Sequence, residues 1–171
     1  AYADAPTHFA RALGLARTGQ VAAAREEVSR LEALHRRLEA EKNTYWAGQV
    51  DIQRQVAAAW VAYAEGRPTE ALALLRKAAD AEDATEKSAV TPGPLAPARE
   101  LLGEMLLEAK QPSEALIAFE ATLKKEPNRF RAVYGAARAA ESPGDRKKAA
   151  EYYRKLLDIC RMRNTPIVTL I

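Results

Sequence analysis

Apolar and polar positions alternate along most of the chain with a period of three to four residues, which is the period of an amphipathic helix. The longest stripe of this kind consists of Tyr45, Gln49, Ile52, Val56, Ala59 and Tyr63. Together with helix breakers and capping residues, the pattern predicts eight helices. They are expected over about 6–17, 21–41, 43–65, 68–81, 97–109, 112–126, 128–141 and 145–161.

Turn residues separate these segments. Gly19, Gly66 and Gly144 each follow a helical stretch and are expected to end it, since glycine commonly breaks a helix. Prolines at 92, 94 and 97 exclude a helix interior there, so 91–97 is expected to be an ordered connector, or a loop that shapes the mouth of a groove. Residues 167–171 are apolar and mostly β-branched, and are expected to cover the end of the array, dock on another copy or be disordered.

The last two helix pairs repeat each other. Lys110 and Gly144 occupy equivalent turns 34 residues apart, and each is followed five residues later by an alanine. Phe119 and Tyr153 follow those alanines at equal distance. This spacing and these residue types resemble the tetratricopeptide repeat (TPR) family. The matching positions are Leu102, Gly103, Leu106, Ala115, Phe119 and Pro127 in one pair and Ala136, Ala137, Ala140, Gly144, Ala149 and Tyr153 in the next.

The resemblance implies an all-α fold, a right-handed TPR-like α-solenoid of about four helix-turn-helix pairs with eight helices. The repeat domain would cover 1–163, with pairs at approximately 5–41, 43–81, 95–126 and 128–161 and an apolar tail at 164–171. Gly103 and Ala137 would let neighbouring helices approach closely, while Phe119 and Tyr153 fill the space between pairs. The first two pairs match more weakly, and Lys110 stands where a turn glycine is usual.

Composition agrees with packed helices. The chain has 171 residues, of which 48% are hydrophobic and 29% charged, and no apolar run approaches the roughly 18 residues that a membrane span needs. From Lys124 to Arg163 the net charge is +7, whereas the remainder carries −4. This basic quarter is either a solvated helix face or a surface for nucleic acid. In it, Phe130 and Tyr153 are assigned to packing.

No constellation of residues predicts catalysis or metal binding. His8 and His35 lie on different helices without metal-ligand spacing, and no glycine-rich phosphate loop occurs. Cys160 is the only cysteine and has no nucleophile signature, so it is expected to pack as a small apolar residue. We expect no enzyme activity, no cofactor and no metal.

The family resemblance implies a binding groove lined by the first helix of each pair. The residues that register places there are Phe9, Leu13, Trp60, Tyr63, Glu100, Glu104, Arg131, Tyr134 and Arg138. Trp60 is also suited to the core beneath the preceding helices. The carboxylate clamp by which TPR cofactors of chaperones hold a C-terminal tail is absent, since its places hold Phe9, Leu13 and Ala57.

The preferred hypothesis is therefore a non-catalytic scaffold that binds a protein or peptide partner of unknown identity on its concave face. The alternatives are a nucleic-acid-associated protein that uses the basic C-terminal quarter, and a self-association module that forms a homodimer. The chain starts at Ala1, so we expect a processed end or a fragment of a larger bacterial-type TPR protein. A single cysteine suits the cytoplasm and the periplasm equally, so the compartment stays undecided.

Overall fold

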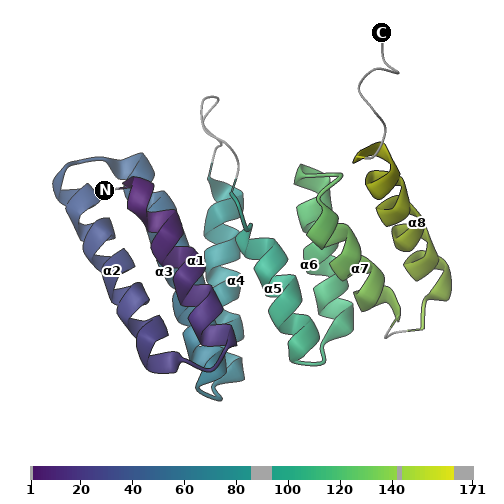
Figure 1. The fold of residues 1–171 in the computed structure, drawn as a ribbon, viewed down its shortest axis with the longest axis horizontal. Helices are drawn as coiled ribbons and strands as arrows, with labels where there is room; N and C mark the ends of the chain where they lie inside the picture. The colour runs from purple at the N-terminus through teal and green to yellow at the C-terminus, as the bar shows by residue number, and fades with distance from the viewer. Residues whose placement is uncertain (1, 86–93, 142–143, 164–171) are drawn as a thin grey trace, which may run out of the picture. The chain divides into compact units, whose positions relative to one another are not determined.

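The computed structural model describes residues 2–85, 94–141 and 144–163, and these residues form one short 3-10 helix and eight α-helices without a strand (Figure 1). The prediction of an all-α chain of eight helices is confirmed. The elements are η1 (Tyr2–Asp4), α1 (Ala5–Arg17), α2 (Val21–Ala40), α3 (Thr44–Ala64), α4 (Pro68–Ala84), α5 (Ala98–Glu108), α6 (Pro112–Lys125), α7 (Phe130–Glu141) and α8 (Arg146–Arg163).

The chain divides into two compact units, Ala1–Leu101 and Leu102–Ile171, which are described separately here. The expectation of one repeat domain over 1–163 stays a prediction. The expectations for the tail at 164–171, for most of the proline segment, and for the turn at 142–143 concern residues outside the described ranges.

Five turns in the described ranges are built in the same way. Each has one residue with positive φ: 78° at Gly19, 56° at Lys42, 77° at Gly66, 58° at Lys110 and 83° at Gly144. The next residue donates its N–H to a carbonyl five residues earlier, over 2.8 to 3.2 Å, which satisfies the end of the preceding helix.

The following helix begins at once. The residue after the left-handed one uses its carbonyl to start that helix, because the carbonyl accepts the N–H of the residue four positions later. In all five turns the residue that donates this N–H is an alanine. All five alanines are buried, so each turn brings a small side chain to the place where two helices meet. They are Ala24, Ala47, Ala71, Ala115 and Ala149.

In the first unit, α3 is the central element, since it packs against α1, α2 and α4 (Figure 1). It buries nine of its residues. Ile52, Val56 and Ala59 of the apolar stripe are among them, whereas the other three members of the stripe are half-buried. Large side chains such as Leu31, Val56, Trp60 and Leu75 fill the space between these helices. Burial of this apolar surface is the main term that stabilises the unit.

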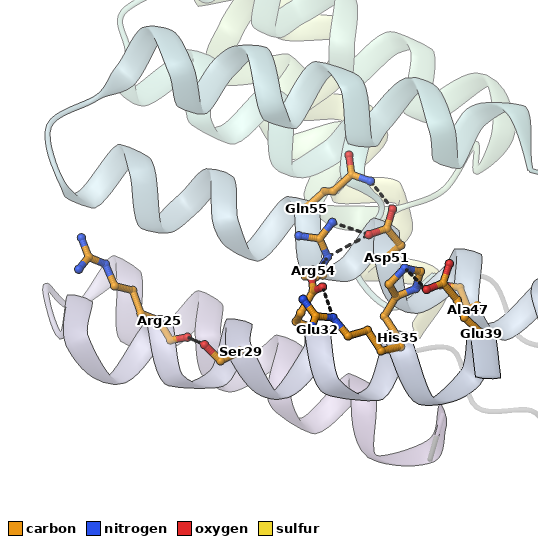
Figure 2. A network of polar contacts seen from close by, with 10 residues as sticks. Arg25, Ser29, Glu32, His35, Glu39, Ala47, Asp51, Arg54 and Gln55 are labelled. Carbon is orange, nitrogen blue, oxygen red and sulfur yellow. Dashed lines mark hydrogen bonds and ion pairs between the residues drawn. The ribbon is translucent and has the colours of Figure 1, made fainter. Parts of the chain in front are cut away.

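Polar contacts fix the register of α2 against α3, as Figure 2 shows. Arg54 bridges the two helices, because Nε lies 3.0 Å from Glu32 Oε2 and also donates to Asp51 on its own helix. His35 Nδ1 lies 3.1 Å from the carbonyl oxygen of Ala47, so the imidazole donates there. Burial alone raises the pKa of Asp51, but hydrogen bonds and charge from Arg54 outweigh it and hold that pKa below its usual value.

A buried carboxylate joins α1 to α2. Glu27 is 2% exposed, and His8 Nδ1 donates to it over 2.6 Å. Arg11 and Arg30 lie 3.1 and 3.0 Å from its other oxygen. Burial by itself raises the pKa of Glu27, yet the His8 hydrogen bond and the two arginine charges hold it below the ordinary value. A charge this deep is tolerated because three donors surround it.

Charged contacts also connect the end of α4 to the start of α5. α4 extends to Ala84, beyond its predicted end near Ala81, and its acidic residues there have partners. Arg99 Nε donates to Asp83 over 2.8 Å and Nη2 lies 2.7 Å from Asp80. The side chain of Glu82 accepts the N–H of Ala98 over 2.7 Å and so caps α5 from sixteen residues away. Pro97, which directly precedes the helix, has no side-chain acceptor and cannot form such a cap.

In the second unit, α7 packs between α6 and α8. Phe119 on α6 is 1% exposed, as expected from the repeat, and its ring lies against Gly103 on α5 and Gly135 on α7. A Cβ added to Gly103 would be 2.7 Å from the ring, closer than real Cβ contacts allow. Two glycines on different helices therefore make the space that the ring occupies.

Candidate binding surface on helix α7

α7 is buried around most of its circumference. Seven of its twelve residues are buried, and all seven are alanine, glycine or valine. Small side chains let α6 and α8 approach the helix axis closely. The only residues of α7 that reach solvent are Phe130, Arg131, Tyr134, Arg138 and Glu141.

The exposed residues lie on one side of the helix, because they recur at intervals of three or four positions. Phe130 and Tyr134 are each 44% exposed, and Arg131 and Arg138 are exposed as well. We name these four residues the α7 surface. Exposed aromatic side chains beside arginines form the composition that is most enriched at the energetic centre of protein interfaces.

Two contacts order the α7 surface. Arg131 Nη2 donates to Glu104 on α5 over 2.5 Å, so this arginine has a carboxylate partner. The guanidinium carbon of Arg138 lies 5.8 Å from the ring centroid of Tyr134, one helical turn earlier, within cation–π distance. The predicted site residues Glu104, Arg131, Tyr134 and Arg138 are thus together within the second unit.

Phe130 was assigned to packing from the sequence, and that assignment is wrong, since the side chain is nearly half exposed. α7 begins at Phe130 and not at Asn128, because the N–H of Arg129 closes a turn with the carbonyl of Glu126. This places Phe130 in the first turn of the helix, on the same side as Tyr134. The spacing of four residues between Phe130 and Tyr134 was the feature of the sequence that could have predicted this shared side.

The predicted groove residues of the first unit are deeper. Phe9 and Trp60 are 7% and 2% exposed, so the structure places both in the core, whereas Leu13 and Tyr63 are half-buried. Sequence reasoning missed Arg17, whose guanidinium carbon lies 4.6 Å from the Trp60 ring centroid. The spacing of Phe9, Leu13 and Arg17 by four indicated that Arg17 lies on the same side of α1. Its contact with Trp60 could not be predicted without the position of α3.

Glu100 and Glu104 lie one helical turn apart on α5 and differ in exposure. Glu100 is fully buried and Glu104 is half-buried. Only Glu104 therefore contributes to the exposed polar surface, through its ion pair with Arg131. The role of all nine residues in ligand binding stays a prediction.

Among the described residues, histidine, cysteine and acidic side chains nowhere gather in a group of three that suits a metal ion. No helix within the described ranges combines the length and apolar character that crossing a membrane requires. Cys160, which was expected to pack, is exposed.

No protein-family model matches the chain, and no curated protein matches it significantly. What can be inferred about function therefore comes from its own residues.

Proposed function

We propose that this chain is a non-catalytic, TPR-like module that binds an extended peptide segment of a partner protein on the α7 surface. The helix pairs, their five equivalent turns and the 34-residue spacing of the last two turns support the TPR-like assignment. The observation that carries the binding proposal is a contrast between the two sides of α7. Its buried side consists of small residues alone, whereas its exposed side carries aromatic and basic side chains.

The contrast matters because packing does not require the exposed residues. Phe130 and Tyr134 keep nearly half of their area in water although both are large and partly apolar. A partner that covers them gains hydrophobic burial of about 25 cal/mol per Å² of apolar area. Arg131 and Arg138 add directional hydrogen-bond donors at the same place.

A random-peptide display library panned against the purified chain tests this proposal. Enriched sequences are synthesised with a fluorophore, and their dissociation constants are measured by fluorescence anisotropy. Tyr134→Ala should weaken binding by about tenfold or more, which corresponds to about 1.4 kcal/mol. Ile117→Ala is the matched control, since Ile117 is 67% exposed on α6 and is not part of the α7 surface.

Circular dichroism melting curves establish that both variants remain folded, as expected for exposed positions. Equal binding of the enriched peptides to wild type and Tyr134→Ala would reject the α7 surface. A library from which nothing enriches would reject peptide binding by this chain.

A further inference from the structure

The arginines of the α7 surface indicate the chemistry of its ligand, an inference that rests on the proposed function. The two arginines of the α7 surface differ in their surroundings. Arg131 is paired with Glu104, so its charge is already compensated. Within the described ranges Arg138 forms no ion pair; its guanidinium lies over the Tyr134 ring and also acts electrostatically on the hydroxyl of Tyr153.

The acidic residue nearest to Arg138 in sequence is otherwise engaged. Glu141 lies three positions further along the helix and accepts a hydrogen bond from the hydroxyl of Tyr153. That hydrogen bond and burial of the ring raise the pKa of Tyr153, so its hydroxyl stays protonated at neutral pH. The α7 surface consequently carries one positive charge without a carboxylate partner.

The contact with Tyr134 suits Arg138 to a carboxylate ligand. A guanidinium that rests on an aromatic ring keeps its N–H groups available at the edge, in the fork geometry that matches two carboxylate oxygens. The ring also restricts the side chain, so less conformational entropy is lost when a ligand binds. A lysine at this position would lack the planar fork.

The length of the α7 surface sets a spacing on the ligand. Phe130 and Arg138 are eight residues apart, which is about 12 Å along a helix. An extended peptide advances about 3.3 Å per residue, so it covers that distance in three to four residues. An apolar ligand residue on Phe130 would thus be three or four positions from the residue that meets Arg138.

We propose that Arg138 determines specificity on the α7 surface by binding the side-chain carboxylate of an Asp or Glu that lies three or four positions from an aromatic or large aliphatic residue of an extended peptide. The ligand is therefore an acidic, partly apolar segment of a partner protein. Binding weakens as ionic strength rises, because an exposed ion pair contributes to it.

The first test compares libraries selected on wild type and on Arg138→Glu. Selection on wild type should enrich peptides with Asp or Glu at the stated spacing. Selection on Arg138→Glu should enrich peptides with Lys or Arg at that position. Enriched wild-type peptides without an acidic preference would overturn this inference while leaving peptide binding intact. Enrichment of nothing at all would reject the proposed function itself.

The second test uses one enriched peptide, synthesised with an amidated C-terminus so that only side chains supply carboxylates. Changing its acidic residue to the corresponding amide should weaken binding to wild type about tenfold and leave binding to Arg138→Gln unchanged. Arg154→Gln is the matched control, because Arg154 is an exposed arginine on α8, off the α7 surface. Equal losses with both arginine variants would show only an effect of net charge and overturn the inference.

The same variants distinguish nucleic acid from peptide. A short single-stranded oligonucleotide, measured by filter binding at low salt, should be retained no better by wild type than by Arg138→Gln. Retention that depends on Arg138 and that displaces the enriched peptide would assign the surface to nucleic acid and overturn the inference.

Discussion

Phe119 and Gly135 share a space that leaves no room for a side chain on residue 135. The Phe119 ring lies closer to the position of a Cβ on Gly135 than to the one on Gly103, and both are closer than real Cβ atoms approach. Because ring atoms, and not the end of a flexible chain, would meet the new methyl group, a larger residue must displace α6 or α7.

Gly135→Ala should therefore lower the free energy of unfolding by about 1–3 kcal/mol, the usual cost of overpacking. Urea denaturation followed by circular dichroism measures it. Gly48→Ala is the control, since Gly48 lies within α3 with nothing near its Cβ position, and it should raise stability by about 0.5–1 kcal/mol. Two changes of the same sign would contradict the packing role of Gly135.

Lys110 has φ of 58°, a conformation that costs an L-residue roughly 1–2 kcal/mol and costs glycine little. Lys110→Gly should therefore raise the free energy of unfolding, by about 0.5–1 kcal/mol after the added freedom of the unfolded chain is deducted. Lys110→Ala removes the same charge but keeps the Cβ, so it should leave stability within about 0.5 kcal/mol of wild type. Equal effects of both substitutions on the free energy of unfolding would mean that the loss of charge, and not the backbone conformation, causes the change.

Glu27 should make stability depend on pH in the acid range. Its pKa is lower in the folded chain than the ordinary 4.5, so the folded state favours the ionised form. Its contribution is present above pH 4.5 and is lost as pH falls through the lower folded-state value. Glu27→Gln should lower the free energy of unfolding by about 1–3 kcal/mol at pH 7, and by less in acid.

Denaturation of wild type and Glu27→Gln at several pH values measures that difference. Glu26→Gln is the control, because Glu26 is the exposed neighbour of Glu27, and it should produce a small difference that does not change with pH. A Glu27→Gln difference that persists unchanged well below pH 4 would contradict the assignment.

Glu82→Ala should expose the first turn of α5 to hydrogen exchange. The carboxylate of Glu82 accepts the N–H of Ala98, and without it that donor has no cap. Exchange at Ala98, measured by NMR or mass spectrometry, should become faster by about five- to tenfold, while amides in the middle of α6 remain unchanged. Unaltered exchange at Ala98 would mean that the cap contributes nothing.

Helix type and number were predictable because periodicity and turn residues are local signals. The turn alanines Ala115 and Ala149 were found in the same way, five residues after Lys110 and Gly144. Ala47 was missed because Lys42 is not a residue that marks a left-handed turn. The extension of α4 was missed because it depends on Arg99, which comes from another helix.

The candidate site was predictable only in part. Register along a helix indicates which residues share a side, and it brought Arg131, Tyr134 and Arg138 together correctly. It does not reveal depth, which depends on what packs against that side. Trp60 and Arg138 occupy equivalent places, each six residues before a left-handed turn glycine, yet only Arg138 is exposed.

The small buried residues of α7 have a consequence for how this helix can change over evolution. Alanine, glycine and valine carry its packing, and they are separate from the residues that face water. On the proposed function, a substitution at 130, 134 or 138 would therefore alter which partner is preferred with little cost in folding. Duplicated copies of such a module would then diverge in partner choice while retaining the same architecture, and a designer would reprogram recognition by varying these positions alone.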